Sequence, residues 1–201
     1  MRRHRQNPQS KAIWWALGLG AAGTAAYFLL RKSPSAHSGK QLPPGPGPDP
    51  GLEARRARLL PLFRAAAQKH GVPLAWLLAL AHRESAFRNV RSKPGASDDR
   101  RGGAFGPLQM TSATAADLGY RAQATLEERG AAILADPGIG IDLGARYVAR
   151  LVKRFGQDLA KVAAGYNAGP GAVQRGQVPA STRDRYVPAV VALADRYASV
   201  A

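Results

Sequence analysis

Apolar residues recur with a helical period along most of the chain after residue 51. A spacing near 3.6 residues is typical of helices with one buried face, and no stretch alternates convincingly like a half-buried strand. The periodic stretches span residues 59–70, 74–87, 112–118, 126–134, 141–155, 159–166 and 182–197. The pattern predicts a mainly α domain over residues 52–201, built from about seven helices.

Glycine and proline mark where these helices are expected to end and begin. Four glycines follow periodic stretches, where a left-handed residue commonly closes a helix, and these are Gly71, Gly119, Gly156 and Gly169. A proline in a first turn loses no intrahelical hydrogen bond. Three prolines suit such first turns, and these are Pro61, Pro73 and Pro170.

Residues 12–30 form an uncharged, mainly apolar stretch of 19 residues. As a helix it would span about 28 Å, close to a hydrocarbon core of about 30 Å. Residues 1–11 carry basic side chains and no acid, so the positive-inside rule keeps this N-terminus in the cytoplasm. We therefore expect a single-pass inner-membrane anchor, with the rest of the chain on the periplasmic, wall-facing side.

A cleaved signal peptide is the alternative interpretation of the same segment. Its apolar core would normally be about 7–15 residues long, so this stretch is long for one. The small residues at 33–36 supply only a loose cleavage site. Between the apolar segment and the domain, residues 31–51 are rich in proline and glycine and predict an extended linker.

The composition excludes several kinds of site. The chain has no cysteine, so disulfides, thiol nucleophiles and Cys-ligated metals are excluded. Its histidines lack metal-ligand spacing, and these are His4, His37, His70 and His82. Neither a metal nor a cofactor is expected.

The formal net charge of +16 favours an anionic partner. A nucleic acid is not expected as a specific ligand, because no aromatic-plus-basic binding motif accompanies the charge. Cell-wall polymer and anionic lipid are equal candidates. An ordinary solvated, Arg-rich surface explains the charge as well.

Glu84 ends an apolar run and is the most informative residue of the chain. At helical spacing it shares a face with Leu77, Leu80 and Ala81, which should be the buried face. A carboxylate at the edge of an apolar face is costly to ionise, so its pKa should rise and it can serve as a general acid. The alternative is an ordinary ion pair with Arg88 one helical turn later.

Four short motifs after the linker carry the main functional signal. They are AHRESAF at residues 81–87, GPLQMT at 106–111, AGYNAGPGAV at 164–173 and TRDRYV at 182–187. In this order and spacing they resemble the motifs of lytic transglycosylases with a lysozyme-like domain, the soluble-lytic-transglycosylase (SLT) family. The resemblance extends over residues 59–197.

The resemblance implies an enzyme that cleaves peptidoglycan glycan strands between N-acetylmuramic acid and N-acetylglucosamine and forms a 1,6-anhydro product. It makes Glu84 the sole general acid and base, and it implies no cofactor. It also implies residues that bind the glycan or orient the reacting sugar, and these are Ser92, Leu108, Gln109, Tyr166, Asn167 and Tyr186. The resemblance also implies that the hydroxyl of Tyr166 lies near the carboxyl of Glu84.

The chain departs from the family pattern in two places. Pro107 and Leu108 stand where the family has leucine and methionine, which alters the side chains next to the substrate's N-acetyl group. A polar loop at residues 97–103 looks inserted after Ser92, and an inert surface loop is its simplest interpretation.

Two other functions stay open at this point. In a goose-type lysozyme hydrolase, Asp98 or Asp99 of the inserted loop would activate water. In an inactive glycan-binding or assembly module, the motifs would serve binding alone. The sequence does not separate wall turnover, an envelope-spanning secretion apparatus and a phage virion as the setting. For catalysis we expect Arg88 to point away from Glu84, since a tight ion pair would lower the pKa of this carboxyl.

Overall fold

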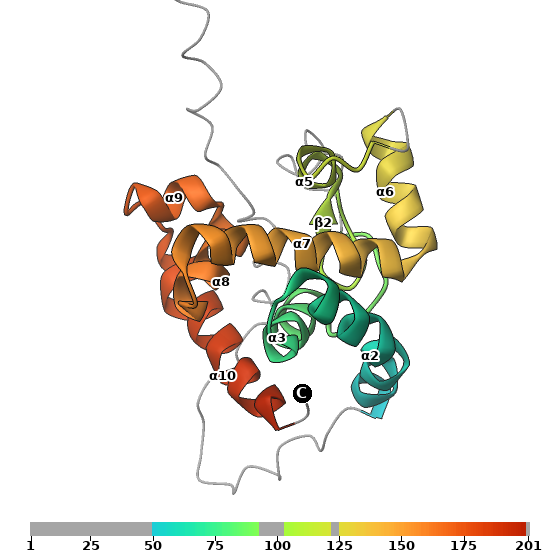
Figure 1. The fold of residues 1–201 in the computed structure, drawn as a ribbon, viewed down its shortest axis with the longest axis horizontal. Coiled ribbons are helices and arrows are strands. Elements are labelled where there is room, and N and C mark those ends of the chain that lie inside the picture. The colour runs from blue at the N-terminus through green and yellow to red at the C-terminus, as the bar shows by residue number, and fades with distance from the viewer. Residues whose placement is uncertain (1–49, 93–102, 122–124, 200–201) are drawn as a thin grey trace, which may run out of the picture.

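The computed structural model describes residues 50–92, 103–121 and 125–199, and these residues are mainly helical (Figure 1). The helices are α2 (Pro50–His70), α3 (Leu74–Ser85), α5 (Ser112–Asp117), α6 (Leu126–Ala135), α7 (Pro137–Phe155), α8 (Leu159–Ala168), α9 (Pro170–Gln174) and α10 (Val187–Ala198). The predicted membrane anchor, most of the linker and most of the inserted loop lie outside the described residues. Helix α2 begins at Pro50, two positions before the expected start of the domain.

Helix α3 forms the centre of the hydrophobic core. It packs against α2, α7 and α10, and its residues Leu77, Leu78 and Leu80 have no exposed surface. Figure 1 shows α7 running across the molecule, with α8 and α9 at one end and α6 at the other. Because α3 is covered by several helices, a polar group at its end is held by segments far apart in the sequence.

Helix boundaries follow the glycine and proline signals with one exception. Each of the four glycines follows a helix and has a positive φ, as predicted; at the C-cap of α7, Gly156 has a φ of 71°. Pro170 opens α9, and Pro73 is the N-cap of α3. The prediction for Pro61 is wrong, since it lies inside α2. Pro61 is exposed there, so solvent can reach the backbone carbonyl that its missing N–H leaves unpaired.

A small antiparallel hairpin, which the periodicity did not predict, joins the centre of the fold to α5. Strand β1 (Ala104–Phe105) pairs with β2 (Met110–Thr111), and an isolated bridge links Arg91 to Phe105. Strands of two residues are too short to show any alternation of apolar and polar positions.

The predicted C-terminal helix is divided in two. A π-helical turn, η2 (Thr182–Tyr186), precedes α10. Turns of this kind are rare and occur often at functional sites, because they change the direction of the side chains locally.

None of the helices in the described residues is long and apolar enough to cross a membrane. The predicted anchor at residues 12–30 lies outside them.

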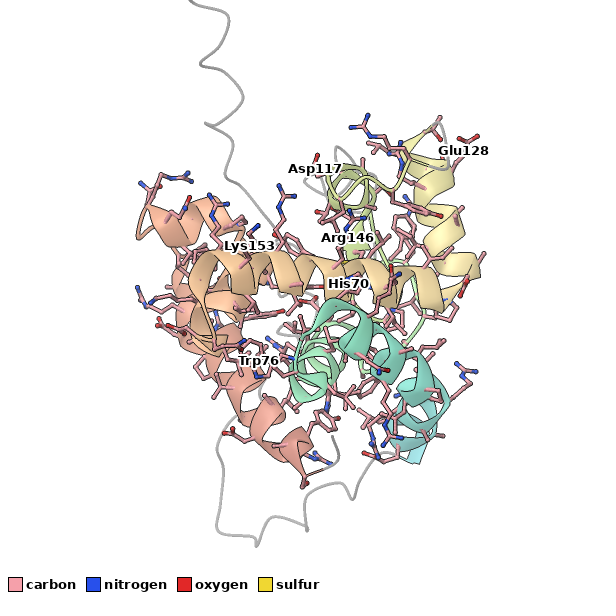
Figure 2. The ribbon with its side chains drawn as sticks, viewed as in Figure 1. His70, Trp76, Asp117, Glu128, Arg146 and Lys153 are labelled. Atoms are coloured by element: carbon pink, nitrogen blue, oxygen red, sulfur yellow. The ribbon has the colours of Figure 1, made fainter. Side chains whose placement is uncertain are left out.

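Where the end of α2 meets α7, Lys69 and His70 bond to Asp142 at 2.8 and 2.9 Å. Figure 2 labels His70 at this junction. This junction holds two long core helices together.

Candidate active site

Glu84 lies one residue before the end of α3, at the border of a buried face. Leu77, Leu80 and Ala81 share that face and are fully buried, as predicted. Glu84 itself retains partial exposure. The carboxyl group therefore lies where the apolar core gives way to the surface.

The chain turns sharply directly after this carboxyl. Ala86 and Phe87 adopt the left-handed conformation, with φ of 52° and 59°, which is uncommon for residues other than glycine. The hydroxyl of Ser85 donates to the carbonyl oxygen of Pro107 at 2.7 Å. Strained backbone of this kind concentrates at functional sites. The hydrogen bond of Ser85 holds the end of α3 against the turn that contains Pro107.

Tyr186 is the hydrogen-bond partner of Glu84. Its phenol donates to Oε1 of the carboxyl, and the ring is almost completely buried, with 3% exposure. Tyr186 ends the π-helical turn, whereas Glu84 lies in the last turn of α3. The bond thus joins residues that are 102 positions apart in the sequence.

Burial raises the pKa of Glu84 to about 7, against the hydrogen bond from Tyr186 and the charge of Arg83, which both lower it. A carboxyl with this pKa is protonated to a large extent near neutral pH, so it can both give and take a proton. Burial and the charge of Glu84 raise the pKa of Tyr186 well above its ordinary value. The phenol therefore remains a donor throughout the range in which Glu84 titrates.

Tyr166 lies close to this pair but bonds elsewhere. Its hydroxyl donates to the carbonyl oxygen of Leu108 at 2.7 Å and to the sulfur of Met110 at 3.4 Å. Burial raises the pKa of Tyr166 well above its ordinary value, and the charge of Glu84 adds to the effect. The ring also packs against Tyr147, with centroids 5.4 Å apart. Tyr166 thus supports the wall of the site, with its hydroxyl directed to a backbone carbonyl.

The side chain of Leu108 does not lie where the resemblance places it, along the glycan. It is fully buried, and it packs so closely on Gly144 of α7 that a Cβ there would lie 2.3 Å from Leu108 Cδ1. Its apolar side chain is drawn into the core between the hairpin and α7. The group that Leu108 contributes near Tyr166 is its backbone carbonyl.

Asn167 holds two parts of the site together. The hydroxyl of Thr182 donates to Oδ1 of Asn167 at 2.6 Å, and both residues are buried. The bond links α8, which carries Tyr166, to the π-helical turn, which carries Tyr186. This position gives Asn167 a structural role.

Gln109 has a φ of 47°, and its amide group donates to the carbonyls of Val90 at 3.0 Å and Gly106 at 2.8 Å. Among the described residues nothing binds its amide oxygen, which remains an acceptor. Ser92 pairs with Ala104, its N–H donating at 2.8 Å and its hydroxyl oxygen accepting at 3.3 Å. Gln109 and Ser92 are both partly exposed, on the segment around the hairpin.

The two arginines near Glu84 differ in their surroundings. Arg88 is exposed, and within the described ranges no ion pair joins it to Glu84, so the ion-pair alternative is not what the structure shows. Arg83 lies against the ring of Tyr186, with Cζ 5.5 Å from the ring centroid. The sequence analysis did not predict a role for Arg83, which it gave only as part of a motif. The one feature that could have indicated a role is its place directly before Glu84.

Within residues 50–92, 103–121 and 125–199, no three His, Asp or Glu side chains come together in a way that could hold a metal ion. In the part of the chain that the structure describes, the groups around Glu84 include the phenols of Tyr186 and Tyr166 and the guanidinium of Arg83. Such an arrangement can transfer protons.

Comparisons with known proteins agree on the fold. The family model described as "Transglycosylase SLT domain" matches residues 61–187. The structure is similar to that of an inactive mutant, glutamate to glutamine, of the lytic transglycosylase Slt from Pseudomonas aeruginosa. The TM-score is 0.55 with 23% sequence identity, and the match covers 70% of this chain but only 24% of the Pseudomonas chain. This chain therefore corresponds to about a quarter of that protein, and the predicted mainly α, lysozyme-like SLT fold is confirmed.

Proposed function

The chain belongs to the transglycosylase SLT domain family, and we propose that it is a peptidoglycan lytic transglycosylase with Glu84 as its single acid and base. The observation that carries this proposal is the carboxyl of Glu84, whose pKa burial raises to about 7 while Tyr186 fixes its Oε1. Among the described residues the carboxyl takes part in no ion pair, and it is only partly exposed to solvent.

The reaction proceeds in two proton transfers through Glu84. Protonated Glu84 donates to the glycosidic oxygen as the bond from C1 of N-acetylmuramic acid to the leaving sugar breaks. The muramoyl acetamido group stabilises the positive charge that develops at C1. Deprotonated Glu84 then takes the proton of the 6-hydroxyl, and that oxygen closes onto C1. No water is consumed, and the carboxyl returns to its starting state.

A single carboxylate is consistent with what surrounds Glu84. Glycosidases that hydrolyse usually employ a second carboxyl within about 5–9.5 Å. In the part of the chain that the structure describes, the phenol of Tyr186 and the guanidinium of Arg83 act on the Glu84 carboxyl, and the charge of Glu84 acts on the phenol of Tyr166. Asp98 and Asp99, the candidates for a hydrolase, lie outside the described residues.

Around this carboxyl we assign glycan contacts to the partly exposed polar groups. Gln109 offers its amide oxygen to a sugar hydroxyl or amide, because both donors of its amide nitrogen already bond to backbone carbonyls. The partly exposed hydroxyl of Ser92 is assigned the orientation of the reacting sugar. Leu108, Tyr166 and Asn167 act from behind these groups by holding the backbone and Tyr186 in place.

The membrane anchor at residues 12–30 remains a proposal that rests on the sequence. It would place the domain on the wall side of the inner membrane, with residues 31–51 as the tether, and it suits local opening of the wall. Secretion, wall turnover and entry by a phage all require such opening. Localising the native protein in cell-envelope fractions or in virions decides between them, and recovery from the soluble fraction alone would contradict the anchor.

The reaction is tested by digesting purified sacculi with the full-length protein and identifying the muropeptides by mass spectrometry. We expect 1,6-anhydro ends. Glu84→Gln should slow their release about 10²–10⁴-fold, the usual contribution of a general acid and base. Asp142→Asn is the matched control, since it makes the same chemical change far along the chain, and it should release ends at the wild-type rate.

Three other outcomes would each contradict part of the proposal. Reducing ends in place of anhydro ends would indicate a lysozyme-type hydrolase. Undiminished cleavage by Glu84→Gln would remove Glu84 from the reaction. Binding of sacculi by the wild-type protein without any cleavage would indicate a glycan-binding module.

A further inference from the structure

Arg83 lies directly before Glu84 in α3, yet its guanidinium packs on the side chain that binds Glu84. Cζ of Arg83 is 5.5 Å from the centroid of the Tyr186 ring. The hydroxyl of the same ring donates to Glu84. Tyr186 is therefore held at two points, by a cation over its ring and by the carboxyl at its hydroxyl.

The ring is the partner that the structure gives this guanidinium. Among the described residues, the buried Nε of Arg83 has no hydrogen-bond acceptor and Arg83 takes part in no ion pair. A buried N–H without an acceptor is rare in proteins and calls for an explanation at each occurrence. A cation over an aromatic face is attracted by the ring's electron density, which explains why the guanidinium stays there.

Adjacent residues in a helix point about 100° apart and do not face each other. Among the described residues Arg83 forms no close ion pair with Glu84 that would hold the carboxyl ionised. Its charge still reaches the carboxyl, since it lowers the pKa of Glu84 and that of Tyr186. The arrangement gives a cation that acts on the acid without neutralising it.

The other charged and titratable groups near α3 face different partners. Arg55 of α2 donates to the backbone carbonyl of Ala86 at 2.9 Å. His82 bonds to Tyr197 of α10 at 2.8 Å. On the side of the carboxyl, α8 contributes the phenol of Tyr166.

We propose that Arg83 is a positioning residue, which fixes the Tyr186 ring and thereby directs the phenol to Oε1 of Glu84. It acts through Tyr186 and need not touch the glycan. This inference deepens the proposed function and rests on it for its catalytic meaning, but the arrangement itself can be tested without substrate.

The test is a ¹³C NMR titration of the Glu side-chain carboxyls in the full-length protein, without glycan, with Glu84→Gln identifying the Glu84 signal. In Arg83→Gln the Glu84 midpoint should rise by roughly 0.5–1 pH unit, since both the charge and the fixed phenol are lost. Arg83→Lys keeps the charge but loses the planar group and should shift the midpoint by less than half as much. Arg88→Gln removes an exposed charge one turn away and is the matched control, with no shift expected.

Two further measurements make the result decisive. If Arg83 acts through the phenol, Arg83→Gln should shift the midpoint less in a Tyr186→Phe background than in the wild type, because coupled residues are non-additive. Thermal unfolding by circular dichroism should show that Arg83→Lys remains folded.

A midpoint in Arg83→Gln equal to that of Arg88→Gln, or an equal shift in both backgrounds, would overturn the proposal. Because the readout needs no turnover, failure here is distinct from failure of the proposed reaction. If the titration behaves as expected and sacculi are not cleaved, Arg83 keeps its positioning role and the proposed function falls.

Discussion

Glu84 and Asp142 are two carboxyls of one domain whose surroundings drive them in opposite directions. Burial raises the pKa of Glu84 to about 7, and the bond that the described residues supply to its carboxyl comes from the phenol of Tyr186. Burial also acts to raise the pKa of Asp142, but the hydrogen bonds and charges of Lys69 and His70 outweigh it, so this pKa lies below its ordinary value. Both carboxyls belong to helices of the same core. Their pKa values differ because Asp142 bonds to Lys69 and His70, whereas Glu84 bonds to a neutral phenol.

Under the proposed function, the comparison separates a carboxyl that transfers protons, Glu84, from a carboxyl that joins two helices, Asp142. The side chain of Asp142 is 36% exposed, and a cation on the neighbouring helix stabilises its ionised form. Among the described residues Glu84 has no such pair, and Arg83, whose charge lowers the pKa of Glu84, lies over an aromatic ring. In the proposed reaction Glu84 delivers a proton near neutral pH, and an ion pair would oppose this by stabilising the ionised carboxylate.

The largest expected effect is a pH-dependent gain of stability in Glu84→Gln. The folded state raises this pKa from about 4.5 to about 7, so folding binds a proton between these values and the wild type loses stability as pH rises through them. The loss is on the order of 3 kcal/mol at most. Glutamine keeps the acceptor for Tyr186 and removes the charge. Urea unfolding should therefore show Glu84→Gln close to the wild type at pH 4 and clearly more stable at pH 8.

In the same experiment, Asp142→Asn should change the pH dependence of stability in the opposite direction. A lowered pKa gives stability that is present above the ordinary aspartate value and is lost as pH falls through the folded value. This variant should be less stable than the wild type at pH 8. A gain of stability in both variants, or in neither, would remove the distinction between the two carboxyls.

Of the contrast between Glu84 and Asp142, the sequence could predict the burial of Glu84. The period of the apolar run places Glu84 on the face of Leu77 and Leu80, and local spacing alone determines that burial. The same pattern predicted most helix ends, because Gly71 and Gly156 act within a single turn. Pro61 misled the prediction, since a proline on the exposed side of a long helix looks like a helix start.

The rest of the contrast depends on contacts between distant segments. Tyr186 is 102 positions from Glu84, and Asp142 lies 72 positions from His70. No periodicity gives such pairs; for Tyr186, the family resemblance alone indicated the neighbourhood. The burial of Leu108 against Gly144 and the π-helical turn were likewise not predictable, because each is decided by how the hairpin and helices pack.

Removing the partner of each carboxyl sharpens the comparison further. Tyr186→Phe deletes the bond that lowers the pKa of Glu84, so this pKa should rise and the fall of activity at high pH should move to higher pH. Release of anhydro ends should drop by roughly tenfold to a hundredfold, the equivalent of one hydrogen bond to a charged group. The pH profile of sacculus cleavage measures both effects.

Tyr197→Phe is the control for that experiment. It deletes the hydroxyl of another buried tyrosine, which bonds to His82 at 2.8 Å on a different side of α3. It should leave the pH profile unchanged. A profile that moves to lower pH in Tyr186→Phe, or that moves equally in both variants, would show that the phenol does not act on Glu84.

The smallest effect is expected at the junction of α2 and α7. Lys69→Met removes a cation that is itself 64% exposed, so solvent screening limits the loss of stability to about 1 kcal/mol or less. His70 still bonds to Asp142 at 2.9 Å, and cleavage of sacculi should continue at the wild-type rate. Urea unfolding of Lys69→Met, Asp142→Asn and the double variant measures the coupling directly, since a real pair gives a double variant less affected than the sum of the two. Strict additivity would mean that Asp142 gains nothing from Lys69, and its low pKa would then have to come from His70 alone.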